Sequence, residues 1–270
     1  MSAIEIVEYG SWHELKRDLF IELFGKGGFR SGRYLFRGMG NADWRLSSSF
    51  DRQFSSLDRD QRLLLWEQLT QEWRRSCEET GIPDSVLRDD QKLWALGQHN
   101  GLPTRLLDWT TSPYVAAFFA FEDWPAQLPH EFSHVAIWVL HLDNQVWSRE
   151  TGVEIVTPPA LENIRLKNQS GKFTLSRTPL ATLEEYVEQF SIGSALTKVV
   201  LPASEALPAL PDLDSMGINS YHLFTDLTGL AKMATMRVLV ELATETAEHA
   251  LASPGADRDA VGLGRLSATV

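Results

Sequence analysis

Cysteine is almost absent from this sequence, in which Cys77 is the one cysteine among 270 residues. A single thiol excludes an intrachain disulfide and a zinc site built from several thiolates. Cys77 also follows Leu65, Leu69 and Trp73 at four-residue steps. This spacing predicts a core-facing side chain and disfavours a nucleophilic role.

Long apolar runs and basic charge are also scarce. No run approaches the roughly 18 apolar residues of a membrane span, and the N-terminus carries acidic residues where a signal peptide carries basic ones. We therefore expect a cytoplasmic protein without a membrane partner. Lys and Arg number 25 against 36 Asp and Glu, a formal net charge of -11, which argues against a nucleic-acid partner because the overall field repels phosphates.

Several catalytic signatures are missing as well. The glycine-rich stretch GKGGFRSG at 25–32 does not have its lysine and hydroxyl in the order that a P-loop requires, and no GxGxxG follows a strand. His99 and Asp108 belong to no HExxH or HxH spacing that would indicate a metal, and no GxSxG indicates a serine nucleophile. We expect no metal and no resident cofactor.

The sequence does contain a mixed series of helices and strands without a regular βαβ rhythm, which predicts an α+β fold with a mixed, mostly antiparallel sheet. Prolines break 204–217 into helical turns. We expect one domain over 1–250 and a flexible tail over 251–270. The expected helices are 12–24, 58–80, 84–98, 113–124, 182–190 and 225–251, and the expected strands are 33–38, the centre of 99–112, 134–142, 153–156, 163–167, 172–176 and 195–202.

Polar functional side chains are densest in the segment 98–112, QHNGLPTRLLDWTTS. An imidazole, a guanidinium, a carboxylate, amides and hydroxyls lie there on one loop, which leads into a nearly all-apolar and hence buried helix. Rigid elements would hold these groups beside a cleft. Arg37 ends a strand in YLFRG, and its forked guanidinium suits a carboxylate or a diphosphate.

Two stretches, YLFRGMGNADWRLSSS at 34–49 and LGQHNGLPTRLLDWTTSPYVAAFFAF at 96–121, resemble the FRG-domain family, named for its Phe-Arg-Gly. IRLKNQSGKFTL at 164–175 is similar to the family's Gln-x-Gly-x-Phe element, and 210–234 resembles its C-terminal end, so that the resemblance spans roughly 10–235. It implies a bacterial or phage protein with a role in anti-phage defence or toxin action.

The order of elements also resembles that of the ADP-ribosyltransferases, and this resemblance implies an ADP-ribosyltransferase-like core that uses NAD as a substrate. Gln169 stands where that pattern has a catalytic glutamate. An amide has no full negative charge to stabilise the positive charge that builds on the ribose as nicotinamide leaves. Either Asp108 provides this charge, or the domain is not catalytic and senses a ligand or binds a protein. The resemblance assigns catalytic roles to Arg37, His99, Gln169 and Asp108, and ligand binding to Gly38, Thr104, Arg105, Trp109, Thr110, Thr111 and Ser112.

Structural alternatives stand beside these roles. Arg37 would equally form an ion pair with Asp108, Arg105 would pair with Asp108 to pin the loop, and His99 would satisfy the carbonyls of a helix end. A hydrolase with His99 and Asp108 as general base and orienter is a further hypothesis. The simple interpretation of the remaining residues is that Trp44 and Trp109 belong to the core, Thr110, Thr111 and Ser112 cap the next helix, and Gln169 lies in a turn.

Overall fold

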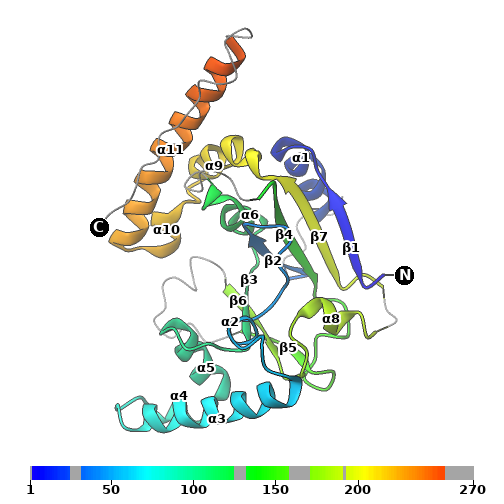
Figure 1. Cartoon of the computed structure of the whole chain (residues 1–270), viewed down its shortest axis with the longest axis vertical. Coiled ribbons are helices and arrows are strands. Elements are labelled where there is room, and N and C mark those ends of the chain that lie inside the picture. Colours follow the sequence, from blue (N-terminus) through cyan, green and yellow to red (C-terminus); the bar gives the residue numbers. More distant parts are fainter. Residues whose placement is uncertain (1, 25–31, 125–131, 158–170, 191–192, 253–270) are drawn as a thin grey trace.

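The computed structural model describes residues 2–24, 32–124, 132–157, 171–190 and 193–252. Its centre is a seven-stranded sheet in the order β1-β7-β4-β2-β3-β6-β5, seen in Figure 1. β1 and β7 are parallel, and every other neighbouring pair is antiparallel. The α+β class and the mixed, mostly antiparallel sheet are thereby confirmed. The strands are β1 Ile4–Glu8, β2 Tyr34–Met39, β3 Leu106–Thr110, β4 His134–His141, β5 Val153–Val156, β6 Gly171–Ser176 and β7 Leu196–Pro202.

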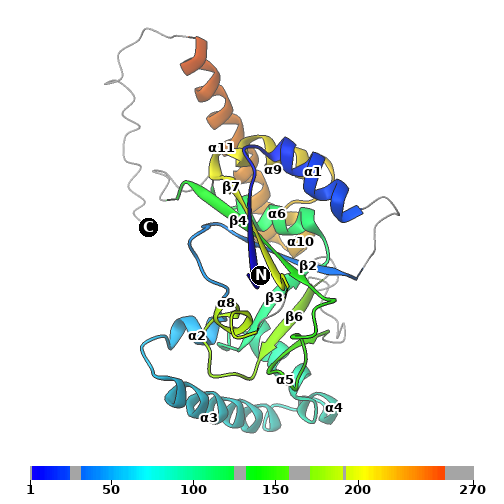
Figure 2. The ribbon, with the colours of Figure 1, turned by 90° about the vertical axis from the view of Figure 1, so that its right-hand side faces the viewer.

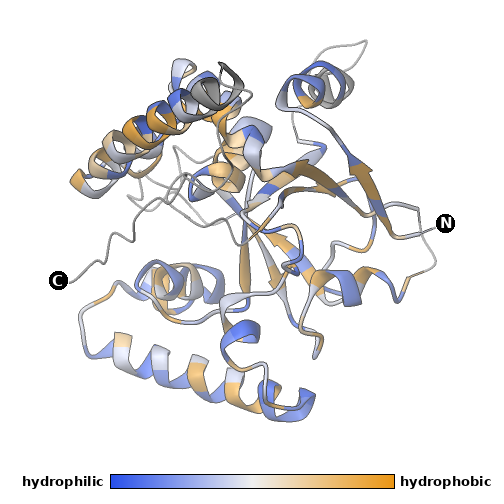
Figure 3. Ribbon diagram, turned by 45° about the horizontal axis from the view of Figure 1, so that its top comes forward, coloured by the Kyte–Doolittle hydropathy of each residue, from blue (hydrophilic) through white to orange (hydrophobic). Residues whose placement is uncertain are grey.

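β4 shows why the middle of the sheet is so apolar, as its colour in Figure 3 makes visible. Val135, Ile137 and Val139 face one hydrophobic cluster, whereas Ala136 and Trp138 face another. A strand that is covered on both faces has no polar side, so it appears as a continuous apolar run.

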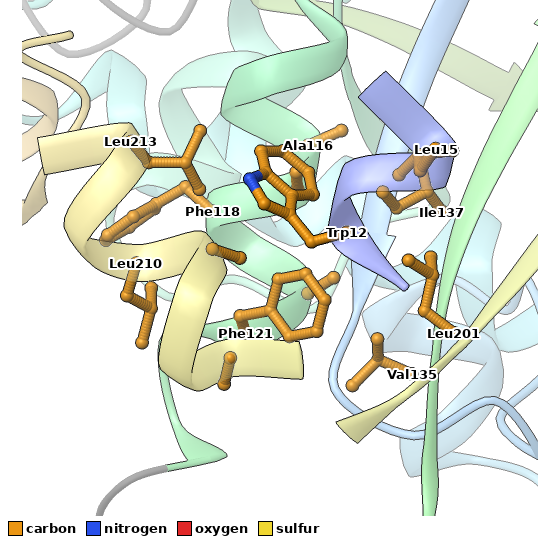
Figure 4. Packing of buried hydrophobic residues seen from close by; sticks show 14 of the residues in the cluster. Trp12, Leu15, Ala116, Phe118, Phe121, Val135, Ile137, Leu201, Leu210 and Leu213 are labelled. Carbon is orange, nitrogen blue, oxygen red and sulfur yellow. The ribbon is translucent and has the colours of Figure 1, made fainter. Parts of the chain in front are cut away.

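The first face of the sheet is covered by α1 (Trp12–Phe24), α6 (Pro113–Phe121) and α9 (Ala206–Ser215). Figure 4 shows Trp12 of α1 between Phe121 of α6 and the leucines of α9. The indole packs edge-on against Phe121 with ring centroids 6.3 Å apart, and its Nε1 donates to Asp212 at 2.7 Å. Burial of a tryptophan with its one donor satisfied ties α1 to α9, although about 200 residues separate them in the sequence.

The other end of the molecule carries the helices α2 (Ser49–Gln53), α3 (Arg59–Glu78), α4 (Asp84–Leu87) and α5 (Asp90–His99). Asp58 and Gln61 form a reciprocal capping box that begins α3. Trp66 and Trp94 pack against Leu106 of β3 and Phe173 of β6. α8 (Leu183–Val187) is fixed from the other side, because both carboxylate oxygens of Glu184 accept from the backbone N–H of Leu46, at 3.0 and 3.1 Å.

The chain ends in α10 (Ser220–Phe224) and α11 (Leu227–Ala252). Thr225 separates them in a left-handed conformation with φ 55°, which ends α10 sharply. α11 packs on α10 and α9 and then rises away from the body of the molecule (Figures 1 and 2).

Most expected elements lie where the sequence places them, and four details are corrected. The helix expected at 84–98 is divided, because Asp89 caps α5 through the N–H groups of residues 91 and 92. The stretch 206–215 is one helix despite Pro211, and the helix expected from 225 begins at 227. β1 and α2 were not expected. The strand expected at 163–167 lies outside the described residues, as does the expected tail beyond Ala252, while the single-domain boundary stays a prediction.

Candidate functional site

A cleft of about 930 Å³ opens where the two ends of the molecule meet. Its walls come from β2 and the following loop, α2, β3, the end of α6, the start of α8 and the end of α10. A smaller cavity of about 210 Å³ adjoins it under α5. Arg37, Arg52 and Asp108 line both cavities and so form their junction.

Arg37 reaches this junction because successive side chains of a strand point to opposite faces. Phe36, its neighbour, is buried in the core. The Nη1 of Arg37 donates to the backbone carbonyl of Asp108 at 2.8 Å and lies 3.8 Å from the carboxylate Oδ2. Burial lowers the pKa of Arg37, the positive charge of Arg52 lowers it further, and Asp108 opposes both. The ion pair between Arg37 and Asp108, which the sequence analysis gave as an alternative to ligand binding, is thus present in the structure. The arginine side chain is still 21% exposed.

Gly38 explains why the third residue of the motif has no side chain. A Cβ at this position would lie 1.9 Å from the carbonyl oxygen of Ala116 and 2.5 Å from the nitrogen of Ala120, both on α6. The glycine therefore lets α6 lie directly on β2. This close packing also places the end of α6 at the cleft, whose wall Gly38 forms together with Arg37.

Asp108 is held by a short chain of side-chain hydrogen bonds. Thr104 donates its hydroxyl to Gln98 Oε1 at 2.7 Å, and Gln98 donates Nε2 to Asp108 Oδ1 at 2.7 Å. Although 60% of the Asp108 side chain is open to the cavities, the surrounding protein excludes enough water to raise its pKa, against the opposing effects of Arg37 and Gln98. Thr104, predicted as a ligand-binding residue, is fully buried and positions this carboxylate instead of lining the cleft.

Arg52 is the second cation of the junction and was not predicted. It lies on α2, which Ser48 begins by accepting from the N–H of Asp51 at 3.1 Å. The Nη1 of Arg52 donates to the backbone carbonyl of Ser47. This bond holds the guanidinium against the wall that both cavities share.

Glu122 and Asp123 make the α6 end of the cleft acidic, beside the partly buried rings of Phe119 and Phe224. Burial and the charge of Asp123 raise the pKa of Glu122 to about 7, while Lys232 acts in the opposite direction. A carboxyl group with such a pKa exchanges protons at neutral pH. Neither acid was predicted from the sequence, because both directly follow an apolar helix and belong to no motif.

Trp44 corrects another expectation. It was predicted to belong to the core, but half of it is exposed and it lines the cleft, with its ring edge-on to Phe132 at 5.7 Å. The neighbouring Arg45 forms an ion pair with Glu185 at 3.1 Å. An exposed indole at a cleft wall is a surface on which a planar ring can stack.

Arg105 lies away from the cleft, and its expected pairing with Asp108 is wrong. Its side chain is 1% exposed and its Nη2 donates to Asp51 at 3.2 Å and to the carbonyl of Leu180 at 3.1 Å. Burial lowers the pKa of Arg105, which Asp51 opposes. Arg105 directly precedes β3, and its side chain reaches Asp51 of α2 instead of Asp108. Arg105 therefore ties β3 to α2.

The other predicted residues divide between the cleft wall and the scaffold. Trp109 and Thr110 border the cleft, but the indole of Trp109 is buried and donates to Thr174 at 3.1 Å, as expected of a core residue. Ser112 caps α6 by accepting from the N–H of Val115 at 3.3 Å, and Thr111 lines neither of the two cavities. His99 is exposed at the end of α5, outside both. Gln169 lies outside the described residues.

Three expectations from the composition can be compared with the structure. Cys77 is buried, and burial raises the pKa of its thiol. Within the described ranges, no group of three or more His, Cys, Asp or Glu side chains is placed to hold a metal ion. Among the described helices, none combines the length and the apolar character that crossing a membrane requires.

The chain thus has an α+β fold with a cleft on its central strands, and Arg37 lies where the cleft joins the smaller cavity. Residues 32–127 match the family model of the FRG domain. The chain therefore contains an FRG domain, and this confirms the resemblance of its first two segments. The matched region includes β2, β3 and α6 and hence the junction, whereas residues 164–175 and 210–234 lie outside it. No curated protein and no solved structure matches the chain.

Proposed function

We propose that the cleft binds a nucleotide that has a phosphate group and a planar ring, namely NAD, and that the chain consumes it as an NAD glycohydrolase or an ADP-ribosyltransferase. The observation that carries this proposal is the junction at which Arg37, Arg52 and Asp108 line both cavities. The ADP-ribosyltransferase-like core, and a use in anti-phage defence or toxin action, are part of the same proposal.

The two arginines suit the diphosphate. Arg52 is near enough to lower the pKa of Arg37 through the repulsion of like charges. A bound phosphate group relieves this repulsion and accepts hydrogen bonds from both guanidinium groups. The smaller cavity, which is lined by Gln53 and Gln98 beside the arginines, has room for such a group.

The rest of the cleft suits the ring of nicotinamide, which carries a positive charge in NAD. Phe119 and Phe224 offer aromatic surface at the α6 end, and Glu122 and Asp123 offer negative charge beside it. Aromatic faces and carboxylates both attract a flat cation. At the opposite wall, the exposed Trp44 provides a surface on which the adenine ring can stack.

The reaction would break the bond between the ribose carbon and the nicotinamide nitrogen, and the electron pair would leave with nicotinamide. Positive charge then builds on the ribose, where the carboxylate of Asp108, fixed by Gln98, stabilises it. Water or the hydroxyl of an acceptor adds to the ribose carbon and loses a proton. Glu122, with a pKa of about 7, is matched to accept that proton.

The test is to incubate purified protein with NAD and to measure free nicotinamide over time. Arg37→Ala and Arg52→Ala should abolish release, whereas Arg88→Ala, which removes an 81% exposed arginine on the surface, should leave it unchanged. Melting each variant without ligand separates a loss of the site from a loss of the fold. If the intact chain releases no nicotinamide and NAD does not raise its melting temperature, the proposal is wrong.

A ligand sensor without catalysis is the second candidate, and one observation favours it. Arg37 and Asp108 are already joined by a hydrogen bond at 2.8 Å, and Gln98 occupies one carboxylate oxygen. In a sensor, the bound ligand would replace these hydrogen-bond partners of Arg37 and Asp108. Stabilisation by NAD without nicotinamide release would identify this role, and a protein target would then be sought.

A further inference from the structure

α11 carries an apolar stripe that its packing within the chain does not use. Its buried side consists of Gly229, Met236 and Val240, which face α10 and α9. On the opposite side Leu227 is 82% exposed, Leu230 40%, Val238 55% and Leu242 54%, and Ala234 is exposed between them. The spacing of three and four residues places this set in one line along the helix.

We propose that the part of this stripe centred on Val238, which includes Ala234 and Leu242, binds the same part of a second copy of the chain, with the two helices antiparallel and the two-fold axis at Val238. An exposed apolar line on a projecting helix marks a contact surface. A two-fold contact uses one patch on both subunits, so the patch must complement itself.

The order of side-chain sizes along the stripe meets this requirement. With the axis at Val238, Ala234 of one copy lies opposite Leu242 of the other, and the reverse holds on the far side of the axis. At these two positions a small residue faces a large one, which lets the helices interdigitate, and Leu230 lies opposite the exposed Thr246. Val238 faces Val238 at the centre.

The charges along one edge of the stripe also complement one another. Arg237 and Glu241 lie on the same edge, because four residues make about one turn. In an antiparallel pair related by a two-fold axis each edge meets its own copy with the direction reversed. Arg237 of one copy thus lies about 3 Å along the helix axis from Glu241 of the other, and about as far from the other Arg237. The two attractive pairs of Arg237 and Glu241 outweigh the one repulsive pair of arginines. Arg237 is still 54% exposed after it pairs with Asp214.

The experiment measures the mass of the full chain by light scattering or sedimentation over a range of concentrations. We expect a dimer that dissociates on dilution. Val238→Glu should raise the dissociation constant about tenfold or more, because a charge replaces a buried apolar side chain at the centre. Glu241→Arg should raise it about two- to fivefold by opposing Arg237. The matched control Leu64→Glu, on α3 with 57% exposure, should dimerise as the unmodified chain does.

Cross-linking tests the antiparallel arrangement separately. Val238→Cys should form a covalent dimer on mild oxidation, since a disulfide needs its two Cβ atoms within about 4.5 Å. Leu227→Cys should not, because two such residues lie about 33 Å apart along antiparallel helices. The native Cys77 is buried and does not interfere. A chain that is monomeric at all concentrations, a dimer that survives Val238→Glu, or equal cross-linking at both positions would overturn the proposal, and none of these outcomes bears on nucleotide binding.

Discussion

Replacement of Gly38 by alanine tests whether the close contact of β2 with α6 holds the site together. The added Cβ would lie 1.9 Å from the oxygen of Ala116 and 2.5 Å from the nitrogen of Ala120. Both are backbone atoms, so no side chain can rotate away and α6 must move by about 1 Å. The helix has little freedom to do so, because Ala117 and Phe118 are fully buried.

Forced overpacking of this kind costs about 1–3 kcal/mol, and the rigid contact places Gly38→Ala at the upper end. About 3 kcal/mol corresponds to a fall of about 6–12 °C in melting temperature for a chain of this size. Gly40→Ala is the matched control on the same wall, since its Cβ would meet only the oxygen of Ala120 at an ordinary 3.9 Å. We expect it to melt within about 2 °C of the unmodified protein.

Thermal melts followed by circular dichroism compare the three proteins. If Gly38→Ala and Gly40→Ala have the same melting temperature, α6 moves away from β2 without loss of stability, and the prediction is wrong. If it melts as expected, the folded variant should also lose affinity at the cleft at room temperature, because β2 and α6 together supply Arg37 and Glu122.

Two further predictions concern buried charges. Arg105→Met should destabilise the fold by about 3–5 kcal/mol, because it leaves Asp51 buried without its cation. Unfolding in denaturant measures this loss, and the double variant Arg105→Met with Asp51→Leu should recover much of it. Glu122→Gln should leave the free energy of unfolding unchanged near pH 4.5 and raise it by roughly 1–3 kcal/mol near pH 8. The reason is that the folded state holds the proton of Glu122 up to about pH 7, whereas the unfolded state releases it at lower pH. A difference in melting temperature between the two proteins that stays constant with pH would contradict this.

The periodicity of the sequence predicts most helices and strands because most of them bury one regular face. α2 was missed because its five residues are too short to show a period and follow a run of serines. β1 was missed because it is an edge strand with mixed polarity, and its pairing with β7 joins residues nearly 200 positions apart. Local pattern contains no information about such a partner.

The site was predictable in the same limited way. Arg37, Gly38 and Asp108 stood out because motif and composition mark them, and they do line the cleft. Arg52 and Glu122 carry no local signal, since their role comes from the loops and helices that bring them beside β2. Arg105 carried a false signal, because a charged residue in a polar segment resembles a ligand group until its buried partner is known.

The three residues of the Phe-Arg-Gly motif have three separate tasks that one strand can combine. Phe36 is buried in the core and Gly38 admits α6, while Arg37, which lies between them, faces the junction of the cavities. Alternation along a strand requires this division, because neighbours must point to opposite faces. The outer two residues therefore fix the depth and direction of the arginine. Arg37→Lys keeps the charge in this frame but loses the fork, so it should fold normally, and if the cleft binds NAD as proposed, NAD should no longer raise the melting temperature of the variant.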